Sequence, residues 1–177
     1  MIKGLNTKGL CKMIQESKHR IIWFKTEGVY YITNRSWAIK FDVIPRDVLV
    51  KLFSITAAVP EEGQSLVMAS YLDEPLVQVP PNMKEIYETA LRGIPAKRTD
   101  FLKSSDKLLM RIFKTANEKI FVDEKYLQAV DMQNYDGEII GSGRMSPIIF
   151  KNLNFLILPY RITNVEDSSF IEELINE

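Results

Sequence analysis

Residues 21–41 read IIWFKTEGVYYITNRSWAIKF and have the pattern of a β-hairpin. The segments 21–25 and 29–41 are rich in β-branched and aromatic residues, which favour strands. Between them lies the turn signal Thr26-Glu27-Gly28, because glycine readily adopts the positive φ angles of tight turns. We therefore predict two antiparallel strands. Alternation places three apolar residues on one face of the second strand: Trp37, Ile39 and Phe41.

Outside the hairpin, helical spacing of apolar residues predicts four short helices. A helix at 7–17 follows the N-cap Asn6, a helix at 45–55 starts at Pro45, and Asn82 caps a helix that runs to residue 91. A fourth helix, capped by Asp123, is expected at 123–130. Strands are expected at 65–71, 76–79, 108–113, 119–122, 138–141, 147–150 and 155–158. The polar, basic segment 93–106 is expected to be a linker or mobile loop.

The order of these elements predicts an α+β fold with two similar units. Pro80 and Pro81 close the first unit, because proline neither donates to a β-ladder nor continues a helix. The predicted units are 1–81 and 82–165, each packing short helices on an antiparallel sheet. They are followed by an acidic tail, 166–177, in which a capping box at Ser169 opens a small amphipathic helix.

The composition excludes several kinds of chemistry. Cys11 and His19 are the only cysteine and histidine, so we expect no internal disulfide and no cysteine or histidine metal site. The sequence has no glycine-rich phosphate loop and no Ser/His/Asp set. Two acidic pairs are expected to cap helices or face water: Asp73-Glu74 and Asp123-Glu124. We therefore expect a protein that is not an enzyme and needs no cofactor or metal.

The hydropathy of the chain indicates a soluble protein. Of its 177 residues 46% are hydrophobic, which is enough to form a core. No apolar run reaches the roughly 18 residues of a membrane helix, and the first residues lack the pattern of a signal peptide. We expect a cytoplasmic protein with no membrane partner.

Charge is unevenly distributed although the net charge is zero. Five of the 23 acidic residues lie in 166–177, which has no basic residue, so residues 1–165 carry five more basic than acidic residues. The N-terminal stretch is the most basic: before residue 26 only Glu16 opposes six cations. This stretch is either a solvated helix face or part of a surface for nucleic acid.

Three segments resemble the β subunit of bacterial DNA polymerase III, the sliding clamp. Residues 26–39 resemble its strand pair ending in Thr-Asp-Gly-X-Arg-Leu-Ala, with Asn34, Arg35 and Trp37 in place of the usual central residues. Residues 43–52, VIPRDVLVKL, resemble its Ile-Val-Pro-Arg-Lys segment. Residues 122–127, 145–150 and 155–162 resemble the last third of its final domain.

The resemblance implies an abbreviated clamp. A clamp subunit has three full domains, whereas this chain has room for two short units, corresponding to the middle and last domains. Residues 93–120 and the tail beyond residue 162 have no counterpart. Two units cannot surround a duplex and clamp rings use six, so three chains are expected to associate. The reduced size fits an origin in a phage or a mobile element.

Clamp helices offer basic side chains to DNA phosphates, a contact that is independent of base sequence. The resemblance therefore implies double-stranded DNA as a partner. Solvated surface ion pairs would give the same sequence pattern, and both interpretations stay open. The candidate DNA-binding residues are Lys8, Lys12, Arg46, Lys51, Lys84, Arg92 and Lys125.

Clamps also hold short peptides of polymerases and repair proteins in an apolar pocket between the middle and last domains. By position its walls would be Thr33, Arg35, Ser36, Trp37, Ala38, Leu158, Pro159, Tyr160, Arg161 and Ile162. Aromatic residues there are suited to be binding hot spots, or they could fill the pocket. Ordinary core and strand-end packing is the other interpretation.

The sequence thus predicts a noncatalytic, sliding-clamp-like scaffold in DNA replication or repair. The alternative is a protein-interaction module that mimics or antagonises a host clamp without encircling DNA. The acidic tail carries four apolar residues that form one stripe: Phe170, Ile171, Leu174 and Ile175. It could pack on its own domain as a terminal helix, plug the peptide pocket, or cover a sheet edge of another chain.

Overall fold

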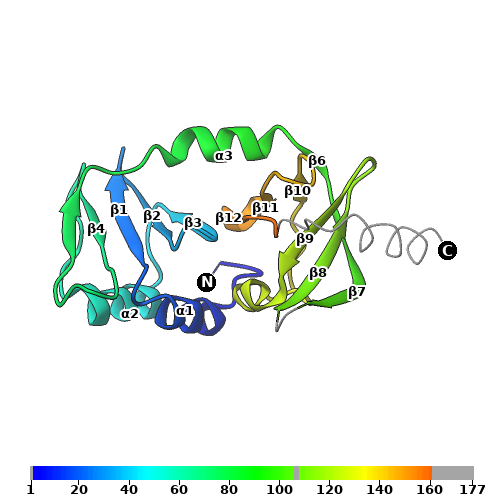
Figure 1. Ribbon diagram of the computed structural model, residues 1–177. Coiled ribbons are helices and arrows are strands. Elements are labelled where there is room, and N and C mark those ends of the chain that lie inside the picture. Colours follow the sequence, from blue (N-terminus) through cyan, green and yellow to red (C-terminus); the bar gives the residue numbers. More distant parts are fainter. Residues whose placement is uncertain (1, 106–107, 161–177) are drawn as a thin grey trace.

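The computed structural model describes residues 2–105 and 108–160, and in it the chain is an α+β protein built on one large antiparallel sheet (Figure 1). The sheet has nine strands, in the order β5-β4-β1-β2-β3-β12-β11-β10-β6. Their bounds are β5 Leu76–Gln78, β4 Ser65–Val67, β1 Ile22–Thr26, β2 Val29–Thr33, β3 Trp37–Phe41, β12 Phe155–Ile157, β11 Ile148–Phe150, β10 Ile139–Gly141 and β6 Ile94–Pro95.

A separate three-stranded sheet lies beside one end of the large sheet (Figure 1). It consists of β7 (Lys97–Ser105), β8 (Leu108–Lys114) and β9 (Lys119–Asp123). Three α-helices and two 3₁₀ helices complete the fold: α1 Thr7–Glu16, α2 Arg46–Thr56, α3 Met83–Leu91, η1 Glu124–Ala129 and η2 Lys151–Leu153. No helix in the described part of the chain is long and apolar enough to span a membrane.

The predicted hairpin is present, with one correction. β1 and β2 pair across the turn at Glu27 and Gly28, which both have positive φ angles. The second predicted strand, 29–41, is in fact two strands, because residues 34–36 turn the chain back and β3 pairs with β2. Asn and Ser favour such turns, a signal that the β-rich composition of the segment outweighed in our prediction.

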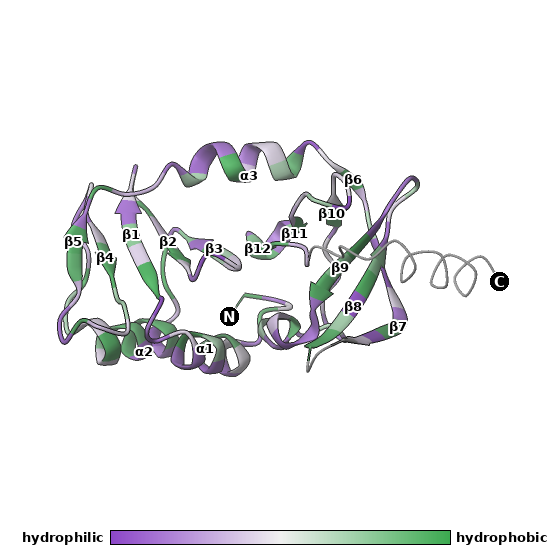
Figure 2. Ribbon diagram, viewed as in Figure 1, coloured by the Kyte–Doolittle hydropathy of each residue, from purple (hydrophilic) through white to green (hydrophobic). Residues whose placement is uncertain are grey.

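Helices cover both faces of the sheet. α1, α2 and η1 pack on one face, and their buried residues join the larger hydrophobic core. As predicted, Trp37, Ile39 and Phe41 lie in this core. α3 crosses the opposite face, where Met83 and Tyr87 join a second, smaller core. Figure 2 shows that α1, α2 and α3 each combine hydrophilic and hydrophobic residues, as expected for helices with one face on a sheet.

Two further predictions are wrong. The segment 93–106, expected to be a linker or mobile loop, contains β6 and all of β7, whose polar side chains belong to strands with an exposed face. The predicted strand 65–71 ends at Val67. The helix predicted at 123–130 is present: it is the 3₁₀ helix η1, capped by Asp123 as expected.

One strand pair connects the N-terminal and C-terminal parts of the large sheet. β3 pairs with β12 in antiparallel register, with Ala38 opposite Leu156 and Trp37 opposite Ile157. The predicted boundary between units, at residues 81 and 82, falls in the segment between β5 and α3. The predicted acidic tail, 166–177, lies outside the described residues.

Candidate peptide-binding pocket

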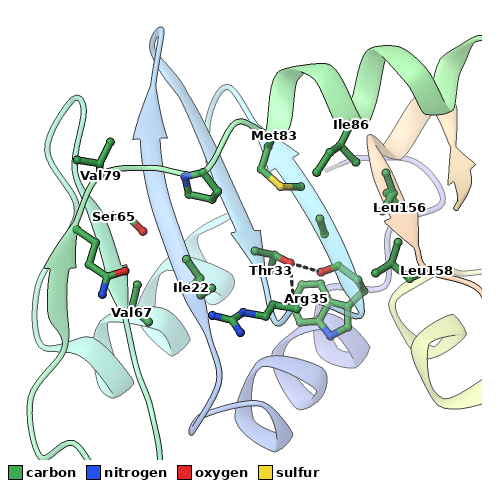
Figure 3. Close-up of a pocket in the computed structure, with 14 residues that line it drawn as sticks. Ile22, Thr33, Arg35, Ser65, Val67, Val79, Met83, Ile86, Leu156 and Leu158 are labelled. Atoms are coloured by element: carbon green, nitrogen blue, oxygen red, sulfur yellow. Dashed lines mark hydrogen bonds between the residues drawn. The ribbon is translucent and has the colours of Figure 1, made fainter.

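A pocket of about 360 Å³ opens on the α3 side of the large sheet (Figure 3). Its floor comes from β1, β3, β4 and β12, and α3 with the segment that precedes it forms a wall above the strands. We call it the apolar pocket. Its lining residues are Ile22, Thr33, Arg35, Trp37, Ala38, Ser65, Val67, Gln78, Val79, Pro81, Met83, Ile86, Leu156 and Leu158.

Most of the pocket lining is apolar, and its polar residues are Thr33, Arg35, Ser65 and Gln78. Met83 and Ile86 extend from α3 toward the strands, and Leu156 and Leu158 come from β12 and the residue that follows it (Figure 3). Arg35 is the one charged residue among the described lining residues. An apolar cavity with a single charged group at its edge suits a ligand that buries aliphatic or aromatic groups and carries a negative charge nearby.

The turn between β2 and β3 holds Arg35 in place. Arg35 has a φ of 73°, a left-handed conformation that is uncommon for a residue with a side chain. Asn34 fixes the turn: its Oδ1 accepts hydrogen bonds from the amides of Ser36 (2.9 Å) and Trp37 (3.2 Å). Its Nδ2 donates to Ser17 Oγ at 2.8 Å. Thr33 Oγ1 donates to the carbonyl of Trp37 at 2.6 Å. The side chains of the turn thus satisfy its backbone and pre-organise Arg35 at the pocket.

The two predicted walls do meet. The amide of Leu158 donates to the carbonyl of Ser36 at 2.9 Å, so the end of β12 is bonded to the β2–β3 turn. The structure places five of the ten predicted peptide-binding residues in the apolar pocket: Thr33, Arg35, Trp37, Ala38 and Leu158.

The other five residues lie elsewhere or are not described. Ser36 contributes its carbonyl to the joint between the walls but is not part of the lining. Pro159 and Tyr160 continue beyond it, and the amide of Tyr160 donates to the carbonyl of Phe121 on β9. Arg161 and Ile162 lie outside the described residues.

The prediction missed the rest of the lining. Leu156 could have been found, since alternation along a strand puts it on the same face as Leu158. Met83 and Ile86 could not, because nothing in the sequence says which face of the sheet α3 crosses. The lining residues from β4 and from the segment 78–81 could not be predicted either, because they line the pocket only where α3 packs on this face of the sheet.

Tyr87 anchors α3 above the pocket floor. Its hydroxyl donates to the carbonyl of Asn154 at 2.9 Å, and its ring meets Tyr31 edge-on with centroids 5.9 Å apart. Burial raises the pKa of the Tyr87 phenol well above its usual value. Burial likewise raises the pKa of Tyr31. Both phenols are therefore neutral near pH 7, and the contact between α3 and the sheet carries no buried charge from them.

A second hollow, of about 280 Å³, adjoins the apolar pocket. The two share Ile22, Arg35, Val67 and Gln78. Its other lining residues are His19, Arg20, Met68, Ala69, Tyr71, Leu72 and Leu76. We call it the basic hollow, because Arg20 and Arg35 are its charged residues and no carboxylate is among its described lining residues.

The candidate DNA-binding residues fall on two faces. Five lie on the helices α1, α2 and η1, which share one face of the sheet: Lys8, Lys12, Arg46, Lys51 and Lys125. The structure does not bring the other two, Lys84 and Arg92, to this face, because α3 and its C-cap lie on the opposite side of the sheet.

Several of these cations already have partners. Lys12 pairs with Glu16 at 3.8 Å, and Lys84 pairs with Glu27 at 3.0 Å. Lys125 pairs with Asp123 and lies over the ring of Tyr126. Lys51 donates to Gln15 at 3.3 Å, which links α2 to α1. The exposed side of α2 also presents Val50 and Phe53 beside Arg46, so this face is not uniformly basic.

The two residues of the acidic pair Asp123-Glu124 differ in their roles. Asp123 caps η1, as expected, but Glu124 does not face water alone. It receives two hydrogen bonds from the buried Arg111, Nε to Oε2 at 2.8 Å and Nη2 to Oε1 at 2.7 Å. Among the described residues, no group of three His, Cys, Asp or Glu could hold a metal ion.

Comparison of the chain with family models, curated proteins and solved structures found no match.

Proposed function

We propose that this protein is a noncatalytic, sliding-clamp-like scaffold of DNA replication or repair that holds partner peptides in the apolar pocket. One observation carries the proposal. Two segments far apart in the sequence, 33–38 and the residues from 156 to 158, line one pocket, and both belong to the segments that resemble the peptide pocket of clamps. The partners would be polymerases or repair proteins with clamp-binding peptides.

The chemistry of the pocket supports this class of ligand. Apolar side chains of a short peptide would bury area against Met83, Ile86 and Leu156, and a rigid floor lowers the entropy cost of binding. The large sheet and the turn fixed by Asn34 supply that rigidity.

Titration of a fluorescein-labelled clamp-binding peptide from a bacterial replicative polymerase tests the proposal. Ile86→Gln puts an amide in the pocket wall and is expected to weaken binding at least about tenfold, since one apolar anchor is lost. Leu91→Gln is the matched control: it lies on the same helix, is 38% exposed against 41% for Ile86, and does not line the pocket. Equal effects of the two variants on peptide binding would refute the proposal.

DNA contact by α1, α2 and η1 is a second candidate function. The observation that favours it is the placement of five predicted cations on one face, opposite α3. A scaffold of this kind would bind peptides on one side of the sheet and phosphates on the other.

Self-association would complete the clamp-like function. Exposed apolar side chains lie on and beside the edge strand β5, with Leu76 41%, Val77 63% and Val79 87% exposed. An edge strand offers unpaired backbone groups to another chain. We expect light scattering to show a mass that rises with concentration toward three chains. A monomer at all concentrations would favour the alternative, an interaction module that antagonises a clamp without encircling DNA.

A further inference from the structure

The apolar pocket and the basic hollow adjoin each other and share four lining residues, and together we call them the groove. One end of the groove is apolar, lined by Met83, Ile86 and Leu156. The other end is basic, lined by Arg20 and Arg35. Among the described residues no carboxylate lines either end. The groove therefore complements a peptide that carries acidic residues next to a few large apolar ones.

The chain contains such a peptide at its own C-terminus. Residues 166–177 read EDSSFIEELINE, with five acidic residues and no basic one. Two apolar pairs, Phe170-Ile171 and Leu174-Ile175, flank Glu172-Glu173. The segment thus places apolar and acidic residues side by side, as the groove places its apolar and basic ends side by side.

The point where the described chain ends favours this occupant over a foreign peptide. Leu158 lines the apolar pocket, and the segment 161–177 begins three residues later. Seventeen residues can span up to about 55 Å when extended, so the segment can reach any part of the groove. Attachment at this position gives the segment a high effective concentration at the groove, on the order of millimolar for a short linker.

We propose that residues 166–177 dock in this groove of the same chain and compete with partner peptides for it. The inference rests on the proposed peptide pocket and adds regulation to it. Phe170 and Ile171 enter the apolar pocket, while the carboxylates of the segment face Arg35 and Arg20. A partner peptide must then displace the segment, which lowers the affinity of the free protein for weak or incorrect partners.

The test uses the full chain and a fluorescein-labelled synthetic peptide of residues 163–177. In the wild type the attached segment competes, so the peptide is expected to bind weakly. The variant F170S/I171S releases the groove and is expected to bind the peptide at least about tenfold more tightly. The control V43S/V50S changes two exposed apolar residues away from the groove and should leave affinity unchanged.

Arg35→Asn in the released variant tests the charge complementarity. Asparagine tolerates the left-handed backbone of this position, so the turn is kept while the charge is removed. We expect peptide affinity to fall about fivefold or more and the salt dependence of binding to decrease. An unchanged affinity would overturn the proposed charge contact.

Further outcomes separate this inference from the proposed function. Equal affinity of the wild type and F170S/I171S for both the tail peptide and the polymerase peptide would overturn the docking of the segment and leave the pocket intact. Failure of both proteins to bind either peptide would overturn both proposals. A lower melting temperature of F170S/I171S without a gain in affinity would show that the segment packs as part of the fold. Dimers that dissociate in F170S/I171S would place the segment in a second copy and overturn docking within one chain.

Discussion

The amide of Leu158 donates a hydrogen bond to the carbonyl of Ser36, with the two atoms 2.9 Å apart. This bond extends the β3–β12 ladder by one step beyond Trp37 and Ile157. It ties the β2–β3 turn to the residue that enters the apolar pocket from the other half of the chain. The geometry of the pocket therefore depends on how firmly the turn is held, and Asn34 holds it.

Asn34→Ala is expected to lower the free energy of unfolding by about 2 to 4 kcal/mol. Asn34 is 4% exposed, and its loss leaves the amides of Ser36 and Trp37 without their acceptor and Ser17 without its donor. Asn34→Asp keeps the acceptor for both amides and should cost less. Urea denaturation of the three proteins gives the comparison, and equal stability of the Ala and Asp variants would contradict the role given to Oδ1.

The ion pair of Arg111 and Glu124 gives a second stability prediction. The Arg111 side chain is 8% exposed, and Nη1 also donates to the carbonyl of Thr99 at 3.2 Å. Glu124→Ala leaves a buried guanidinium without its carboxylate, and we expect a loss of about 3 kcal/mol. The double variant R111M/E124A removes the unpaired charge and should recover part of that loss.

Lys12→Ala is the surface control for this cycle. Lys12 and Glu16 form an exposed pair at 3.8 Å, so its removal is expected to change the free energy of unfolding by less than about 1 kcal/mol. The cycle is completed by the single variant Arg111→Met. If the loss of stability in R111M/E124A equals the sum of the losses in Arg111→Met and Glu124→Ala, the two side chains do not interact energetically.

Much of this architecture could be predicted from sequence, since local patterns set it. The turn at Glu27 and Gly28, the Asn6 and Asn82 caps and most strands follow from residues close together in the chain. The break at 34–36 was missed because the β-rich composition of 29–41 outweighed the turn signal of Asn34 and Ser36, and the bond from Asn34 to Ser17 on another element cannot be read from the segment itself. β7 was missed because its strand partner β8 decides its structure, not its polar composition.

Only the strand walls of the pocket could be predicted, for a similar reason. The resemblance to clamps supplied the walls from 33–38 and Leu158, whose places follow from strand order. The α3 wall exists because this helix packs across the sheet and buries Tyr87. No pattern within residues 82–91 indicates which face of the sheet the helix will cover. The α3 wall of the pocket is thus set by long-range packing, which local sequence patterns do not reveal.

Stability should fall at high pH because of Tyr87. Burial raises the pKa of the Tyr87 phenol in the folded protein well above its ordinary value, whereas in the unfolded chain the phenol ionises at about pH 10. A raised folded pKa means that this stability is fully present below about pH 10 and is lost as the pH rises further. Tyr87→Phe should therefore flatten the fall between pH 10 and 11 in chemical denaturation.

Other tyrosines limit how far Tyr87→Phe can flatten the curve. Burial raises the pKa of Tyr135 to about 12, so this residue contributes a fall in the same direction. Tyr87→Phe also removes the hydrogen bond to Asn154, at a cost of about 1 kcal/mol at neutral pH. An unchanged slope above pH 10 in Tyr87→Phe would contradict the assignment.

The distribution of cations over two faces makes DNA binding testable by location. Lys8 and Lys12 lie on α1, whereas Lys84 and Arg92 lie with α3 across the sheet. If α1, α2 and η1 contact phosphates, K8Q/K12Q should weaken binding to a duplex and K84Q/R92Q should not. Each variant removes two positive charges, so the pair is matched in net charge, and a difference between them reports position alone.

Fluorescence anisotropy with a labelled duplex at several salt concentrations measures the effect. Phosphate contacts release counterions, so the logarithm of the binding constant falls with the logarithm of salt concentration, by a slope of about 0.9 for each contact. Loss of two phosphate contacts in K8Q/K12Q should reduce that slope by about 2 at most. The reduction is smaller if Lys12 contributes less than a full contact, since it already pairs with Glu16. Binding that is insensitive to salt, or equally weakened by both variants, would remove the basis for a DNA-facing surface on α1 and favour the interaction module that works without DNA.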